Sequence, residues 1–274
     1  DDAGMPIAWS HRIVGSSIMA RWAPPLFKDG IDPDAIDGAA DMPYTIENFR
    51  VEYVREEPPG IQTAFWRGVG PTHNVYVIES FIDELAAAAK KDPVEFRRAL
   101  LQKNPRAMHV LNRAAELSNW GKPLGPRQGR GVSVQQAFGT YMCQVAEVTV
   151  SKAGEVHVDR VYIVLDTGVV VNPNTVAAQM QSGVIFGLSA VLWGEITLDK
   201  GRVQQSNFDD YRVMRIDEAP KIVIEIVKSE ADPGGIGEPG TSGLAPAVLN
   251  AVYAATGVRL RKTPIDSKQL KEAS

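Results

Sequence analysis

The chain contains very little cysteine and histidine. Its 274 residues include one cysteine, Cys143, and four widely separated histidines: His11, His73, His109 and His157. A single cysteine excludes a disulfide within the chain and a cysteine-ligated iron–sulfur cluster, which needs four ligands. No two histidines have the spacing of zinc ligands. We therefore expect no metal ion held by protein side chains.

Excess charge and long apolar runs are also missing. The formal net charge is −4, with acidic and basic residues interspersed, so we expect no nucleic-acid surface and no polybasic membrane segment. The longest apolar stretch, residues 176–193, is interrupted by Gln179, Gln181, Ser182 and Ser189. It falls short of the ~20 apolar residues of a transmembrane helix, and we expect no transmembrane segment.

The N-terminus lacks an initiator methionine and a signal sequence. Residues 1–9 have the pattern of a turn followed by the second strand of a hairpin. We therefore expect the chain to begin in the middle of a larger polypeptide.

Helix signals occur in both halves of the chain. Val75, Ile78 and Ile82 form an apolar stripe on a helix that starts near Thr72. Asp92-Pro93 supplies an N-cap and a proline at the first helical position, which predicts a helix through residue 101. Further helices are expected at 106–117, 175–193 and 244–256. The interior glycines of the fourth helix, Gly183 and Gly187, indicate close approach of another backbone or of a ligand, because each costs about 1 kcal/mol against alanine.

Strands are predicted at 49–55, 131–138, 141–150, 155–165 and 222–227, with hairpin turns at 151–154 and 199–201. Residues 119–130 are rich in glycine and proline and give the best domain boundary, with domains at 1–120 and 121–274. Because strands and helices are segregated rather than strictly alternating, the expected class is α+β, with mixed sheets and packed helices.

One carboxylate, Glu238, stands among the glycines of residues 234–243, directly before a predicted helix. Glycine allows close approach of backbone or ligand, so Glu238 is a candidate general base. The alternative is a glycine-rich turn with a solvent-exposed glutamate. Residues 235–240 also fit the G-x-G-x-x-G dinucleotide pattern. Residues 228–234 separate the preceding strand from the first glycine, however, and no acidic strand end follows, so the context disfavours a Rossmann site.

Two further stretches carry polar groups that suit a cofactor. Arg67 stands between aromatic residues and glycines just before a helix start, where N–H groups and the helix dipole favour an anion or an oxygen-rich cofactor. The alternative is an ion pair between Arg67 and a carboxylate. The amides of Gln135-Gln136 and of Gln179 offer donors and acceptors together, as recognition of a pterin-like heterocycle requires. Taken singly, such amides are more often surface or cap residues.

Together these stretches resemble one family: TAFWRGVGPTHNVYVIESFIDELA, VLDTGVVVNPNTVAAQMQSGVIFGLSAVLWGEITL, QSNFDDYRVMRIDEAP and GGIGEPGTSGLAPAVLNAVYAATGVRLR. They are similar to the C-terminal part of the molybdopterin-binding large subunit of molybdenum hydroxylases. Within that xanthine dehydrogenase/aldehyde oxidase superfamily, the nearest branch is the isoquinoline 1-oxidoreductase beta-subunit type. The resemblance implies that 1–120 and 121–274 are the C-terminal parts of the first and second molybdopterin-binding domains.

The resemblance also implies roles for individual residues. Glu238 matches the catalytic glutamate of the family, and Gln179 matches a glutamine that hydrogen-bonds the cofactor. The remaining implied cofactor-binding residues are Arg67, Gly68, Gly70, Gln136, Gly139 and Gly237. A second cofactor loop of the family has no counterpart here, so we expect this fragment to be inactive alone.

The implied activity is hydroxylation of an N-heteroaromatic ring or an aldehyde with oxygen from water. Glu238, as general base, takes the proton from the hydroxyl whose oxygen attacks the substrate carbon. The implied cofactor is molybdopterin with molybdenum, in the cytosine dinucleotide form. Implied partners are the N-terminal part of the molybdenum subunit, a small subunit with 2Fe-2S clusters and a cytochrome c acceptor. A periplasmic location is favoured over a cytoplasmic one. The alternative function is a non-catalytic scaffold segment of a multisubunit oxidoreductase.

Overall fold

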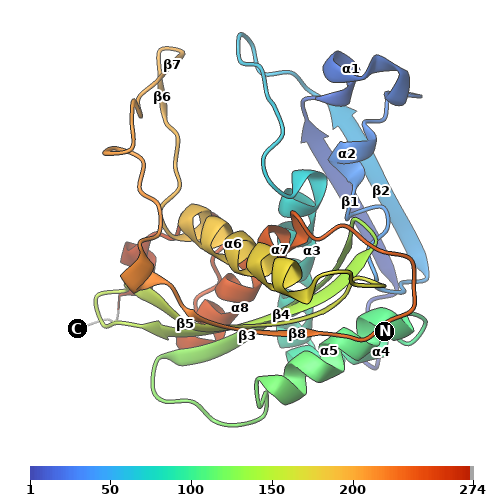
Figure 1. Ribbon diagram of the computed structural model, residues 1–274, viewed down its shortest axis with the longest axis vertical. Coiled ribbons are helices and arrows are strands. Elements are labelled where there is room, and N and C mark those ends of the chain that lie inside the picture. The colour runs from blue at the N-terminus through green and yellow to red at the C-terminus, as the bar shows by residue number, and fades with distance from the viewer. Residues whose placement is uncertain (272–274) are drawn as a thin grey trace.

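A four-stranded sheet forms the centre of the computed structural model, which describes residues 1–271 (Figure 1). Its strands, in spatial order, are β3 (Gln128–Ala137), β4 (Thr140–Val150), β5 (Val156–Asp166) and β8 (Lys221–Ile226). The first three are antiparallel, and the predicted turn at 151–154 joins β4 to β5. β8 pairs with β5 in parallel after a crossover through helix α6 (Pro173–Leu192).

Helices cover both faces of this sheet. In Figure 1, α4 (Pro93–Leu100) and α5 (Pro105–Leu117) lie below it, and α6 and α8 (Leu244–Thr256) lie above it. Side chains alternate between the faces of a strand. Cys143 and Val145 of β4 therefore pack with α5, whereas Met142 and Ala146 pack with α6 and α8. This arrangement confirms the predicted α+β class.

Four helices begin at an Asp-Pro or Asn-Pro pair. Asp32, Asp92 and Asn172 each accept hydrogen bonds from two N–H groups of the first turn, Asn104 accepts one, and the following proline occupies a first-turn position. These pairs start α2 (Pro33–Ile36), α4, α5 and α6. A side-chain cap accepts hydrogen bonds from first-turn N–H groups that have no partner within the helix. Proline is tolerated at this position because an N–H group there would have no partner in the helix. The predicted start at Asp92 is confirmed.

The N-terminal part extends away from the central sheet (Figure 1). Its strands β1 (Ala8–Gly15) and β2 (Asn48–Arg55) pair in parallel, and α1 (Met19–Trp22), a 3-10 turn at Pro24–Leu26 and α2 lie between them in sequence. Helix α3 (Val69–Ala88) starts three residues before the predicted position. Its Ile78 and Ile82 join the core that includes α5 and the sheet. The domain boundary at 119–130 stays a prediction.

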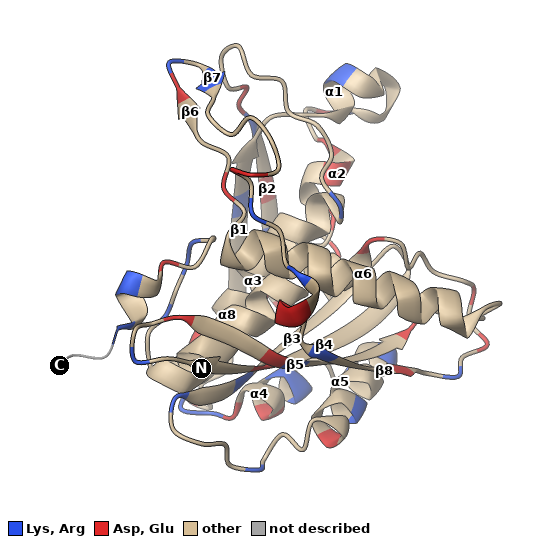
Figure 2. Ribbon diagram, turned by 60° about the vertical axis from the view of Figure 1, so that its left-hand side comes forward, with Lys and Arg blue, Asp and Glu red and all other residues tan. Residues whose placement is uncertain are grey.

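Helix α6 is the one helix in residues 1–271 that is long and apolar enough, by length and composition, to cross a membrane. Figure 2 shows no charged residue along it, while acidic and basic residues are interspersed over the rest of the chain. Val176, Met180 and Val184 of α6 lie in the core. A Cβ on Gly183 would lie 2.9 Å from the carbonyl carbon of Gly240, so close backbone packing explains this glycine.

The remaining elements are short. The predicted hairpin at 199–201 is present between β6 (Leu198–Asp199) and β7 (Arg202–Val203), which project from the body in Figure 1. Two 3-10 turns cover Ile216–Glu218 and Ser267–Leu270. Helix α7 (Pro239–Ser242) directly precedes α8 and follows Glu238.

Candidate functional site

Arg67 joins three segments that are far apart in the sequence. Its Nε and Nη2 donate to the Gly237 carbonyl oxygen at 3.0 and 2.6 Å. Nη2 also donates to Gln179 Oε1, and Nη1 donates to Ser182 Oγ, both at 2.9 Å. Three predicted site residues therefore lie in one hydrogen-bonded group. No carboxylate of residues 1–271 pairs with Arg67. The alternative interpretation, an ion pair between Arg67 and a carboxylate, therefore does not apply to the described residues.

The glycines beside Arg67 are required by the packing of the loop. Gly68 has φ +95, and a Cβ there would lie 2.0 Å from Thr72 Oγ1. That hydroxyl donates to the Arg67 carbonyl oxygen at 2.9 Å. A Cβ on Gly70 would lie 1.8 Å from the Asp34 carbonyl oxygen. Only glycine fits both places, and contact of Gly68 and Gly70 with a cofactor stays a prediction.

Helix α6 presents its polar face to this loop. Gln179 and Ser182 are three residues apart and therefore neighbours on the helix surface. One turn further on, the Phe186 ring lies 4.8 Å from the Trp66 ring, measured between centroids. The Arg67 Cζ lies 5.8 Å from the Phe186 ring. Polar and aromatic contacts together fix the Arg67 loop on α6.

Glu238 is the N-cap residue of α7, but its side chain makes no capping hydrogen bond. The residue is half-buried. Within residues 1–271 its carboxylate accepts no hydrogen bond and forms no ion pair. The preceding Gly237 has open space where a Cβ would stand. The structure thus leaves the carboxylate free of partners next to the carbonyl that Arg67 contacts.

Two turns hold the glycine segment that leads to Glu238. The Gly235 N–H donates to the Phe138 carbonyl oxygen at 2.7 Å, and the Gly234 N–H donates to the Thr167 carbonyl oxygen at 2.9 Å. Thr140 Oγ1 donates to the Gly235 carbonyl oxygen at 2.8 Å. Gly139, with φ +76, lies in the same β3–β4 turn, where a Cβ would be 3.5 Å from Gly234 Cα. Gly139 is therefore next to the segment that carries Glu238.

The two adjacent amides of β3 lie on opposite faces of the sheet. Gln136 lies on the same face of the sheet as Val134, two residues earlier, and Val134 packs with α3–α5. The Gln136 side chain makes no hydrogen bond within residues 1–271. Gln135 faces α7 and is buried, with Nε2 donating to the Pro239 carbonyl oxygen at 2.7 Å. The role predicted for Gln136 stays a prediction. Strand alternation was the signal that distinguishes these two residues, and it identifies Gln135 as the one near Glu238.

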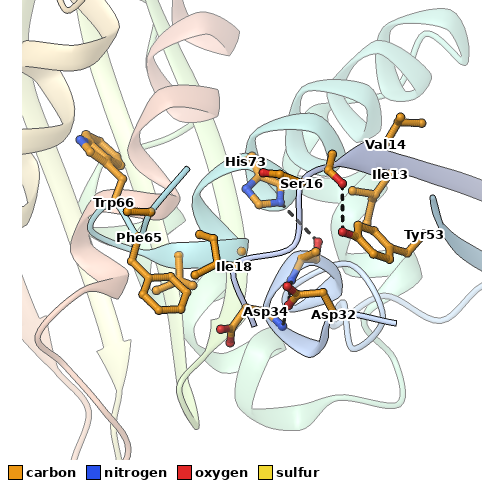
Figure 3. Close-up of a pocket in the computed structure, with 15 residues that line it drawn as sticks. Ile13, Val14, Ser16, Ile18, Asp32, Asp34, Tyr53, Phe65, Trp66 and His73 are labelled. Atoms are coloured by element: carbon orange, nitrogen blue, oxygen red, sulfur yellow. Dashed lines mark hydrogen bonds between the residues drawn. The ribbon is translucent and has the colours of Figure 1, made fainter. Parts of the chain in front are cut away.

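A cavity of about 420 Å³ lies beside the Trp66 loop (Figure 3). Phe65, Trp66 and Tyr53 form aromatic parts of its wall, with Asp34 and His73 also lining it. Burial raises the pKa of Asp34 and lowers that of His73. Gly70, one of the predicted cofactor-binding residues, also lines this cavity, whereas Arg67, Gln179 and Glu238 do not.

These observations define a module of the α+β class in which a guanidinium bonds only neutral acceptors, one of them the carbonyl of the residue before an unpartnered glutamate. The chain belongs to the molybdopterin cofactor-binding domain family, whose models match residues 30–101 and 80–220. The predicted relation to molybdenum hydroxylases is confirmed. Arg67 and Gln179 lie within the matched ranges, and Glu238 lies beyond both.

Among curated proteins, the chain is similar to the beta subunit of isoquinoline 1-oxidoreductase from Brevundimonas diminuta, with 31% identity over 265 residues. That match covers 94% of this chain and 34% of the relative. A nicotinate dehydrogenase subunit of Pseudomonas putida is 33% identical over 269 residues, which cover 91% of this chain and 22% of the relative. The chain thus spans about a third or less of these relatives.

Among solved structures, quinoline 2-oxidoreductase from Pseudomonas putida 86 matches with a TM-score of 0.81. The match covers 98% of this chain and 60% of that chain at 13% sequence identity. At this identity the likeness shows the fold alone, and it agrees with the predicted architecture.

Proposed function

We propose that this chain is part of the molybdenum-binding subunit of an oxidoreductase that hydroxylates an N-heteroaromatic ring or an aldehyde with oxygen from water. The observation that carries the proposal is the group formed by Arg67, Gln179 and Gly237, directly before Glu238, whose carboxylate bonds no group of residues 1–271. The names of two similar proteins, which refer to isoquinoline and nicotinate, support an N-heteroaromatic substrate.

The donor set fits molybdopterin. A guanidinium has five N–H donors, and Arg67 uses four of them on neutral oxygens of this chain. Its positive charge is left for an anionic oxygen of the cofactor, and the Nε2 of Gln179 is left for a polar edge of the pterin. The proposal includes contact of Gly68, Gly70 and Gly139 with the same cofactor, and contact of Gln136 from the face of β3 opposite Gln135. The bound cofactor would activate water-derived oxygen and take up the two electrons that the substrate loses.

Glu238 would act as the general base. A base must lie within reach of the proton that it accepts and must not be occupied by another partner. Its carboxylate meets the second condition, since no group within residues 1–271 bonds to it. The backbone on both sides of it is fixed, because Arg67 bonds the Gly237 carbonyl and Gln135 bonds the Pro239 carbonyl.

Further components are part of the proposal. One cysteine, buried in the core, cannot hold iron–sulfur clusters, so electrons leave through 2Fe-2S clusters on a partner subunit. The rest of the molybdenum subunit supplies the second cofactor loop, and without it this segment is inactive. We also propose the cytosine dinucleotide form of the cofactor, a cytochrome c acceptor and a periplasmic location.

Mass spectrometry of the denatured full-length assembly, with metal analysis of the same preparation, tests the proposal. Release of a pterin dinucleotide, with about one molybdenum per copy of this chain, is expected. A fully assembled complex that contains neither pterin nor molybdenum would show instead that the chain serves as a scaffold.

A further inference from the structure

Gln135 is a buried amide that contacts the residue directly after Glu238. Its side chain is 1% exposed, and its Nε2 donates to the Pro239 carbonyl oxygen at 2.7 Å. Ser242 Oγ donates to Gln135 Oε1 at 2.6 Å, which fixes the orientation of the amide. One side chain of β3 therefore bonds both ends of α7.

Helix α7 needs such support because it is only four residues long. A single helical turn is unstable by itself, Pro239 has no N–H to donate, and the Glu238 side chain makes no capping bond. Within α7 the Thr241 N–H bonds the Glu238 carbonyl oxygen at 2.9 Å. The position of Glu238 thus depends on bonds that come from outside the helix.

These outside bonds reach Glu238 from both sides. Arg67 bonds the carbonyl of the preceding Gly237, and Gln135 bonds the carbonyl of the following Pro239. Arg67 follows the exposed loop residues 64–66, whereas Gln135 sits on a strand paired with β4 along its whole length. The sheet therefore reaches the backbone at Glu238 through Gln135.

We propose that Gln135 is a positioning residue for Glu238, acting through the Pro239 carbonyl; this rests on the proposed function of Glu238 as general base. Loss of the bond would leave the Pro239 oxygen with only the Ser242 hydroxyl as a donor, at 3.2 Å, and α7 would shift toward that weaker contact. A shift of about 1 Å in a reacting group can lower a rate about 100-fold. The carboxylate would remain chemically intact but misplaced.

The test uses the full-length assembled enzyme with Gln135→Met, which keeps the length of the side chain but removes the donor and acceptor. We expect kcat to fall about 10- to 100-fold while KM stays within about twofold and molybdenum content is unchanged. The matched control is Asn74→Leu. Asn74 is a buried amide that donates to the Ala35 and Asp37 carbonyl oxygens at 2.9 and 2.8 Å. It should show a comparable loss in thermal midpoint with kcat within about twofold of wild type.

Gln135→Glu supplies a second readout that a purely structural role would not move. The introduced carboxyl can donate to the Pro239 oxygen only when protonated, and burial raises the pKa of such a group. The ratio of variant to wild-type kcat should therefore rise as the pH falls. If Gln135→Met fails to assemble, the pH dependence of this ratio still tests the proposal. A ratio that does not change with pH would overturn it.

Glu238→Gln separates this inference from the function on which it rests. Wild-type kcat in Gln135→Met, together with an inactive Glu238→Gln, would overturn the role of Gln135 and leave the general base in place. Normal turnover of Glu238→Gln would instead overturn the general base, and the role of Gln135 with it.

Discussion

Two arginines of this chain lie in opposite electrostatic settings. Arg97, on α4, is fully buried, with Nε 3.0 Å from Glu79 Oε2 and Nη1 3.6 Å from Asp83 Oδ1. Tyr44 and the Val134 N–H complete the bonds to Glu79, at 2.6 and 2.9 Å. Arg67 is half-buried and bonds a carbonyl, an amide and a hydroxyl.

The difference shows which arginine serves the fold and which remains available to a ligand. A buried charge is stable only when it is paired and its remaining donors are bonded, and Arg97 meets this requirement within residues 1–271. Arg67 is oriented by neutral acceptors that leave its charge uncompensated. An oriented guanidinium without a carboxylate partner suits an anionic, oxygen-rich ligand.

The largest effect on stability is expected for Arg97→Leu. It leaves Glu79 as an unpaired buried carboxylate, and removal of one partner of a buried ion pair costs about 3–5 kcal/mol. Denaturant unfolding of the full-length assembly should show this loss. Arg261→Met, which removes the exposed ion pair with Glu84, is the control and should shift unfolding only slightly. Equal effects of the two variants would contradict the assignment of Arg97 to the fold.

Arg67→Ala should change cofactor content more than stability. Hydrogen bonds to charged groups contribute about 1.5–3 kcal/mol, so loss of one such bond lowers affinity roughly 10- to 100-fold. Metal analysis of the assembled variant should show depleted molybdenum. Arg67→Lys should restore little, because an ammonium does not reproduce the planar fork. Full molybdenum content in a destabilised Arg67→Ala protein would contradict the cofactor role. It would show that Arg67, like Arg97, stabilises the fold.

A smaller, pH-dependent effect is expected at Arg106, which combines features of both arginines. Its Nε lies 2.7 Å from Asp166 Oδ2 and its guanidinium stacks on Tyr141, yet its side chain is 31% exposed. Hydrogen bonds from Arg106 lower the pKa of Asp166 from 3.8 to about 2. Since the folded-state pKa is the lower one, the pair stabilises the fold above about pH 4. That contribution is lost as the pH falls toward 2.

Thermal midpoints of wild type and Arg106→Gln, measured across this range, check the prediction. The midpoint difference between the two proteins should be constant above about pH 4 and should shrink below it. A difference that stays constant down to about pH 2 would show that Arg106 acts through its stacking on Tyr141 alone.

Local rules predicted much of the fold. Asp92-Pro93 sets a helix start by itself, because cap and proline act within one turn, and the strands around residues 151–154 follow from alternation and turn residues. The parallel pairing of β1 with β2 and of β5 with β8 has no such local signal. It depends on contacts between segments that are distant in sequence.

In the candidate site, too, local sequence motifs predicted some features, whereas others depend on contacts between distant segments. Motifs singled out Arg67, Gln179 and Glu238, and the structure brings Arg67 and Gln179 together with Gly237 next to Glu238. The family resemblance selected Gln136 and not Gln135, although both are amides at one strand end and the structure places Gln135 against α7. The choice between them depends on which face of β3 packs against α7. Strand alternation shows that the two side chains lie on opposite faces, but the packing of the core decides which face meets α7.

The reductive half-reaction of Glu238→Gln in the assembled enzyme is the decisive test of the proposed general base. Glutamine keeps the shape of the side chain but cannot accept the proton, and a general base typically contributes about 10²–10⁴-fold to the rate. We predict a fall of that size, with molybdenum content and thermal midpoint nearly unchanged, because the carboxylate bonds no group of the described chain. Near-normal reduction of the cofactor by substrate in that variant would contradict the role of Glu238.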